Sequence, residues 1–216
     1  MKPFARSILA VALGLASAAP LAAGADQPPV HVRGSISSVS ASSMTVATAK
    51  GPVVIALGPK TGVAGVLPST TDAIVPGTFI GVANVAGNGP ARALEVVVFP
   101  EALRGRGEGD YPWDLPAGGG HTAMTNGTVA ARHGSSMTNA TVAHVTSGAT
   151  KTVSVTYKGG TKQISIPPNA PIVRLEPGTR SLLVAGARVF TVAVLAGGKL
   201  SAAYVAVGEK GTIPPM

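Results

Sequence analysis

The 216-residue chain contains no cysteine, few aromatic residues and few charged residues. The absence of cysteine excludes disulfide bonds, thiolate metal sites and thiol catalysis. Aromatic residues make up 4% of the chain and charged residues 12%, whereas hydrophobic residues make up 45%. Such a chain buries Val, Ile, Leu and Ala and covers itself with Ser, Thr and Gly. This composition is typical of a β-rich exported protein.

Long hydrophobic runs are also lacking after the first residues of the chain. Residues 1–25 resemble an export signal, with a basic start, an apolar run that reaches Leu15 and a small-residue cleavage site that ends at Ala25. A membrane anchor is the alternative, but Pro20 interrupts the apolar run, which is shorter than the roughly 20 residues that span a bilayer. We therefore expect cleavage near Ala25 and a periplasmic or secreted mature protein.

Acidic residues are scarce in the second half of the chain. Residues 26–116 contain six basic and seven acidic side chains, whereas residues 117–216 contain nine and two, a net charge of +7. We expect this second half to contact an anionic component of the cell envelope, such as lipopolysaccharide or a cell-wall polymer, or an acidic protein. The alternative is that the charge only keeps an exported protein soluble.

The residues that are present predict an all-β protein, because apolar and polar residues alternate in short runs separated by turn residues. Ile36 is followed by Val39 three places on, which predicts a β-bulge. Residues 58–75 are predicted to be a longer excursion with one helical turn. Before residue 100 the predicted strands are residues 30–39, 44–49, 53–57, 78–86 and 91–99.

The second half repeats the plan of the first. Val142 and Val145 reproduce the three-residue slip, and Lys158-Gly159 matches Lys50-Gly51 at an offset of 108 residues. We interpret this agreement as an internal duplication.

Five short strands with an excursion between the third and the fourth are the plan of a small barrel of the oligonucleotide/oligosaccharide-binding (OB) type. We therefore predict two tandem five-stranded OB-like barrels joined by a Gly/Pro-rich connector. An open sandwich of the same strands is the alternative. The predicted divisions are a signal peptide at 1–25, a first module at 26–99, a connector with a short helix and a Gly-rich segment at 100–136, and a second module at 137–216.

Residues 99–105 and 112–116, together with the later segment 137–142, resemble a group of bacterial exported proteins that carry a tandem β domain of unknown function. The resemblance covers most of the mature chain. It implies a periplasmic location and a small barrel-like fold, without an established activity.

The connector holds two candidate ligand-contact residues, Tyr111 and Trp113, the second of which is the only tryptophan. One interpretation is a stacking platform for a sugar or a base. The other, which we favour, is a plug in which Trp113 packs between the modules and fixes their relative angle. Residues 105–109 alternate glycine with charge and predict a flexible linker, because the lysine and hydroxyl of a phosphate-binding loop are missing.

Four carboxylates in the connector, those of Glu101, Glu108, Asp110 and Asp114, lack the regular spacing of a calcium-binding loop. We expect them to pair with Arg104, Arg106 or the basic second module instead.

His121, Met124, His133 and Met137 offer the imidazole and thioether donors that suit Cu(I). A periplasmic carrier of Cu(I) or another metal is therefore the alternative function. Arg174, Arg180 and Arg188 are further ligand-contact candidates, but export and sparse aromatic residues argue against a nucleic-acid partner. Because no hydrolytic motif is recognisable, we expect a protein that binds without catalysis and without a cofactor.

Overall fold

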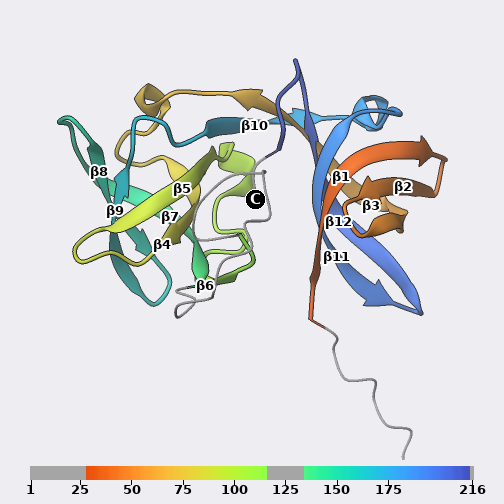
Figure 1. The fold of residues 1–216 in the computed structure, drawn as a ribbon, viewed down its shortest axis with the longest axis horizontal. Coiled ribbons are helices and arrows are strands. Elements are labelled where there is room, and N and C mark those ends of the chain that lie inside the picture. The colour runs from red at the N-terminus through yellow and green to blue at the C-terminus, as the bar shows by residue number, and fades with distance from the viewer. Residues whose placement is uncertain (1–27, 116–133, 215–216) are drawn as a thin grey trace, which may run out of the picture.

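The computed structural model describes residues 28–115 and 134–214, which form twelve β-strands and three short 3₁₀ turns, with no α-helix in these ranges (Figure 1). The prediction of an all-β protein is confirmed. The strands are β1 (Val30–Val39), β2 (Ser43–Thr48), β3 (Gly51–Pro68), β4 (Phe79–Val85), β5 (Ala91–Val98), β6 (Gly109–Trp113), β7 (Ser135–Thr146), β8 (Lys151–Tyr157), β9 (Gly160–Ile166), β10 (Ile172–Gly178), β11 (Arg188–Ala196) and β12 (Lys199–Gly208). The turns are η1 (Thr71–Ala73), η2 (Glu101–Leu103) and η3 (Arg180–Leu182).

Five strands close a β-barrel, which we call the first ring: β1, β2, β3, β12 and β11, in that order. All of its contacts are antiparallel except that between β12 and β3, which is parallel. The interior is filled by Val, Ile, Leu, Ala and Met side chains, such as Ile36, Met44 and Ile55. The five strands can close because these side chains fill a narrow interior without aromatic residues.

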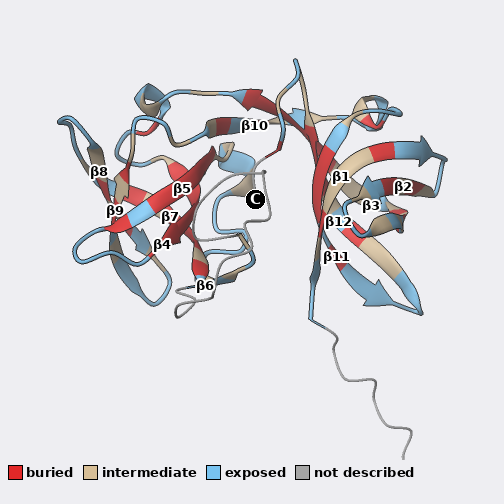
Figure 2. Cartoon of the chain, viewed as in Figure 1, coloured by how far each residue is buried: buried red, intermediate tan, exposed pale blue. Residues whose placement is uncertain are grey.

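A second circuit of pairings, the second ring, runs through β4, β7, β8, β9 and β5. Its closing contact, between β5 and β9, is parallel and short, with Ala91 opposite Ile164 and Arg92 opposite Ser165. A separate apolar core that includes Ile80, Val96 and Ile164 fills it. Figure 2 shows buried positions along the strands of both rings.

The rings do not divide the chain as the sequence predicted. Residues 26–99 were expected to close one module and residues 137–216 another, but each ring combines three strands from one half with two from the other. The first ring joins β1–β3 to β11 and β12, and the second joins β7–β9 to β4 and β5. The strand pattern that the sequence predicts is compatible with closure across the halves as well as within each half, because the hydrophobic alternation of each strand is the same in both pairings.

We call this sharing of strands between the halves the strand exchange. It involves β3, which continues to Pro68, whereas the sequence predicted an excursion from residue 58. Residues 63–67 of this strand are all buried. They pair antiparallel with β10, which also lies parallel to β5. In Figure 1 the end of β3 and β10 run between the two lobes, carrying each half of the chain from one ring to the other. A third apolar cluster, which includes Val66, Leu175 and Phe190, packs there between the rings.

The predicted bulge is confirmed. The register of β1 and β2 shifts between Ile36 and Ser38, and that of β7 and β8 shifts between Val142 and His144. The predicted helical turn after Ser69 is η1, where the hydroxyl of Thr70 accepts a hydrogen bond from the Asp72 N–H.

Residues 1–25, where the sequence predicts an export signal, lie outside the described ranges. Within those ranges, no helix has the length and apolar character that crossing a membrane requires.

Candidate functional site

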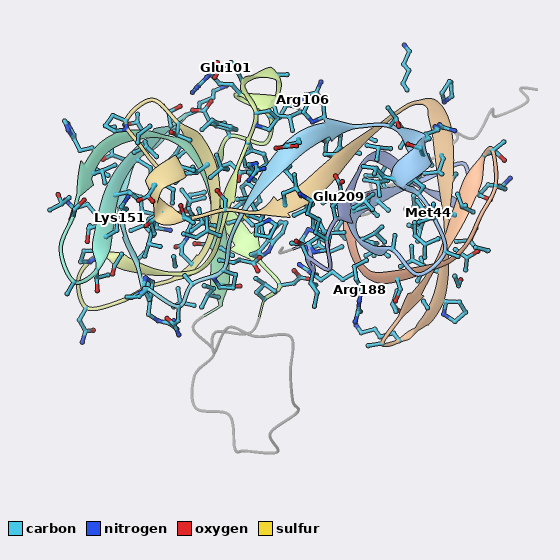
Figure 3. The ribbon with its side chains drawn as sticks, turned by 90° about the horizontal axis from the view of Figure 1, so that it is seen from above. Met44, Glu101, Arg106, Lys151, Arg188 and Glu209 are labelled. Atoms are coloured by element: carbon cyan, nitrogen blue, oxygen red, sulfur yellow. The ribbon has the colours of Figure 1, made fainter. Side chains whose placement is uncertain are left out.

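A cleft of about 250 Å³ lies between the two rings and is the candidate functional site. Its walls come from β6 and β7 on one side and from β10, β11 and β12 on the other, and the connector supplies Leu103, Arg106 and Gly107. In Figure 3, Arg106 lies on the connector at the junction of the two lobes. A cleft at the junction of two packed units is a frequent location for a ligand site.

Most of the aromatic side chains of this aromatic-poor protein meet in the cleft. Five of the eight line it: Phe99, Tyr111, Trp113, Phe190 and Tyr204. The Trp113 ring lies 6.0 Å from that of Tyr111 and 6.2 Å from that of Phe190, measured between centroids. Aromatic faces at these separations form a continuous apolar wall that can take a flat or branched apolar group.

The segment that the sequence predicted to be a flexible linker is a built part of this wall. Gly105 and Gly107 have φ values of 77° and 61°, a backbone conformation that strains any residue with a Cβ atom. The Asn139 side chain donates a hydrogen bond to the Gly107 carbonyl at 3.0 Å. The Lys158 N–H donates to the Glu108 carboxylate at 3.1 Å. These contacts hold the glycine-rich segment against β7 and the turn that follows β8.

Two buried polar atoms of the cleft residues have no hydrogen-bond partner within the described part of the chain. Asn139 donates through its amide nitrogen to the Tyr111 hydroxyl at 2.9 Å, but its Oδ1 is unpaired, and so is the indole Nε1 of Trp113. A buried polar group that the protein leaves unpaired calls for a water molecule or a ligand. Both atoms are inaccessible to solvent, and Asn139 Oδ1 lies against Gly81 of β4.

The two tyrosines of the cleft keep their hydroxyl protons at neutral pH. Burial raises the pKa of Tyr111. Burial also raises the pKa of Tyr204, which the positive charge of Arg106 lowers in part. Arg106 is exposed and lines the cleft, so the site combines a cation with neutral phenol groups.

Trp113 is held by a clamp formed by Asp114 with His31 and Arg33 of β1. Asp114 accepts two hydrogen bonds from the Arg33 guanidinium, both at 2.8 Å, and lies 2.9 Å from His31 Nδ1. The imidazole of His31 packs on the indole with 4.1 Å between centroids, and the Arg33 guanidinium lies 5.0 Å from the Phe190 ring. Trp113 thus contacts both rings, as the plug interpretation predicts, and also lines the cleft.

The clamp lowers the pKa of Asp114. Partial burial by itself would raise it, but the hydrogen bonds from Arg33 and His31 and their charges outweigh burial and bring the pKa to about 2. Asp114 is therefore an anion throughout the physiological range, and the clamp is closed there.

A second polar cluster surrounds Lys162 at the edge of the second ring. Its Nζ lies 3.0 Å from both carboxylate oxygens of Asp110 and 3.0 Å from the Ser136 hydroxyl. A serine beside a lysine is a possible nucleophile only when the lysine is neutral and can take a proton. Here Lys162 forms an ion pair with Asp110 at 3.0 Å, so the cluster has the character of a structural ion pair.

The other predicted residues do not gather at one site. Arg174 pairs with Glu176 at 2.8 Å. Arg180 donates hydrogen bonds to the carbonyls of Ala41 and Gly58. Arg188 lies on the opposite side of the molecule from Arg106 in Figure 3.

The metal hypothesis rests mainly on residues that the structure does not describe. His121, Met124 and His133 lie outside the described ranges. Met137 is buried on β7, opposite Ala83 on one side and Tyr111 on the other, and lines the cleft. Within residues 28–115 and 134–214, no three His, Cys, Asp or Glu side chains gather as a metal site would require.

The four connector carboxylates are spread over separate partners. Glu101 pairs with Arg104 at 2.5 Å, as expected. Asp110 pairs with Lys162 of the second half, also as expected. Asp114 binds β1 of the first half, which the sequence did not predict.

Comparisons of the chain with models of known families, with curated proteins and with solved structures found no match. The site is therefore interpreted from its own geometry.

Sequence reasoning found Tyr111 and Trp113 but missed the rest of the cleft, which includes Phe99, Phe190 and Tyr204. The scarcity of aromatic residues could have indicated these positions, because in such a chain each aromatic side chain has a specific packing site. Their meeting point depends on which strands pair, and the strand exchange decides that.

The strand exchange also changes how the positive charge is divided between the two rings. Taken as residues 28–61 and 179–214, the first ring carries seven Lys and Arg residues against one Glu, a net charge of +6. The second ring, taken as residues 69–115 and 134–171, carries six of each sign. The basic unit is therefore the first ring, and the basic second half that the sequence indicated is split between the two.

Proposed function

We propose that this chain is an exported binding protein whose inter-ring cleft holds an amphipathic anionic molecule without changing it chemically. The observation that carries the proposal is the convergence of five aromatic side chains and Arg106 on one cleft. The aromatic wall takes the apolar part of the ligand, and Arg106 takes its negative charge.

The chemistry of the cleft supports a ligand with both apolar and polar parts. Burying an apolar group against aromatic faces is favourable by about 25 cal/mol per Å² removed from water. Tyr111, Asn139 and Tyr204 add polar side chains to the lining of the cleft. Envelope lipids and their fragments combine apolar and anionic parts. They are therefore ligands of the kind that the sequence predicted as an anionic envelope partner.

We further propose that the protein is not an enzyme, needs no cofactor and is located in the periplasm or secreted. The paired state of Lys162 and the dispersal of the connector carboxylates support binding over catalysis.

We also propose that the two rings are OB-like barrels that arose by duplication and exchanged strands. Corresponding strands of the two halves hold corresponding places in the rings: β1 and β7, β2 and β8, β3 and β9, β11 and β4, β12 and β5. A parallel contact closes each ring: β3 with β12 in the first ring and β9 with β5 in the second.

Trp113 makes the proposal testable by fluorescence, because it is the only tryptophan and it lines the cleft. The chain without residues 1–25 is titrated with 8-anilinonaphthalene-1-sulfonate, an anionic aromatic dye that accepts energy from tryptophan. We expect saturable loss of Trp113 emission. Arg106→Gln weakens the affinity by about tenfold, since a charged hydrogen bond contributes about 1.5 kcal/mol or more.

Arg188→Gln is the matched control, because it removes one positive charge from the opposite side of the molecule. It leaves the affinity for the dye unchanged. The neutral dye N-phenyl-1-naphthylamine binds the wild type and Arg106→Gln equally. Trp113 emission that does not respond at saturating dye, or equal losses from Arg106→Gln and Arg188→Gln, would contradict the proposal.

A further inference from the structure

The first ring opens at one end between β3 and β12. Their parallel pairing begins only at Ser201 and Ala56, so the preceding residues of both strands lie beyond the paired region. A groove of about 510 Å³ occupies this opening. It is separate from the cleft between the rings and shares no lining residue with it.

Apolar side chains line the groove and face solvent. Val54 on β3 is 62% exposed and Leu195 on β11 is 47% exposed, and Leu200 on β12 lies with them. Figure 2 shows the ends of β11 and β12 exposed beyond the body of the ring. Exposed apolar side chains that gather in a groove mark an interaction surface more strongly than scattered ones do.

The backbone at the opening is suited to pairing with another strand. The first residues of β3 pair with β2 on one side, with Val54 opposite Thr45. The first residues of β12 pair with β11 on one side, with Leu200 opposite Leu195. Alternate N–H and C=O groups of each strand therefore point away from these neighbours into the opening, as at any sheet edge.

One lysine lies in the groove and another lies near the start of β3. Lys199 lines the groove, and Lys50 occupies the turn from which β3 starts. Neither side chain forms an ion pair within the part of the chain that the structure describes. They belong to the ring with a net charge of +6, so the field at the groove favours an anionic partner.

The corresponding opening of the second ring lacks these features. Gly87, Gly89 and Pro90 line it in place of large apolar side chains, and its lysine, Lys162, is bound to Asp110. The comparison makes the large apolar lining, and a lining lysine without an ion pair, specific to the groove of the first ring.

We infer that this groove binds an extended acidic segment of a partner protein, which adds as a strand at the opening between β3 and β12. Backbone hydrogen bonds to the free edges would hold the segment, its apolar side chains would contact Val54 on one face of the sheet and Leu195 on the other, and acidic side chains would meet Lys199 and Lys50. A peptide fits better than a nucleic acid or a sugar polymer, because no aromatic side chain lines the groove for stacking.

The test uses a dye-labelled peptide of alternating Glu and Val and the chain without residues 1–25, with fluorescence anisotropy as the measurement. We expect saturable binding that the double variant Lys50→Glu/Lys199→Glu weakens by about tenfold. Lys158→Glu is the matched control, because Lys158 holds the equivalent turn position in the second ring. Lys158→Glu and Arg106→Gln leave binding unchanged, which separates this site from the cleft.

A second peptide, N-methylated at its Val residues, separates strand addition from attraction between charges alone. We expect it to bind at least tenfold more weakly than the parent at the same charge, because it has lost backbone donors. Equal binding of the two peptides overturns the inference. So does tighter binding of an oligogalacturonate or an oligothymidylate than of the acidic peptide, or an equal effect of the Lys158→Glu control.

Discussion

The clamp around Asp114 gives the sharpest prediction for stability. Asp114→Asn keeps the shape of the side chain but removes the negative charge that Arg33 and His31 share. The clamp ties β6, which pairs with the second ring, to β1 of the first ring. We therefore expect the substitution to weaken the contact between the rings and to lower the free energy of unfolding.

The magnitude follows from the pKa of Asp114, which falls from 3.8 to about 2 in the folded protein. Without screening by solvent, this difference corresponds to about 2.5 kcal/mol. The side chain is 49% exposed, so solvent screens its charge and we expect about 1 kcal/mol. A carboxylate with a lowered folded pKa stabilises the protein above its unfolded pKa of 3.8, and this stabilisation is lost as the pH falls through about 2.

Urea unfolding followed by Trp113 fluorescence measures the effect at about pH 6 and again at about pH 2.5. The wild type should exceed Asp114→Asn by about 1 kcal/mol at the higher pH, and by much less at the lower pH. Glu176→Gln serves as the control, because it breaks an ion pair of two exposed side chains and should cost less than about 0.5 kcal/mol. A difference between wild type and Asp114→Asn that does not change with pH, or that does not exceed the control, would refute the reasoning.

Three further predictions follow from the exchanged strands and the cores. Ile55→Ala and Ile164→Ala, at fully buried positions of the first and second ring, should each cost about 2–5 kcal/mol in urea unfolding. Separate transitions for the two variants would contradict shared strands, which predict one cooperative transition. Gly34→Ala should cost several times more than Gly89→Ala, because a Cβ at Gly34 meets a backbone oxygen of β2 at 2.1 Å while Gly89 has open space. A fragment of residues 26–115 should give no folded monomer by circular dichroism and light scattering, because it lacks β11 and β12; a stable monomer would show that the half closes by itself.

The strands were largely predictable because each buries one face, which produces the alternation of apolar and polar residues. The slips at Ile36 and Val142 also predicted the bulges, since a bulge shifts the alternation by one place. The excursion at residues 58–75 was misjudged at its start, because a strand buried on both faces does not alternate and β3 continues there to Pro68.

The candidate site was predictable only where it lies in the connector. Tyr111 and Trp113 stood out because aromatic residues are rare. Arg106 was assigned to a flexible linker, since a repeated Gly-charge pattern does not reveal the positive φ angles that Gly105 and Gly107 adopt. Phe190 and Tyr204 gave no local sign of a site, because their roles depend on a neighbour about 80 to 90 residues earlier in the chain.

Composition and alternation by themselves determined that the protein is built from strands around branched aliphatic cores. They did so because these properties act between residues that are near in the chain. Only the tertiary structure decided which half each strand joins, and with it the place of the cleft and of the positive charge. The local pattern is compatible with either pairing, and in the structure β3 continues to Pro68 and leads from the first ring to the second.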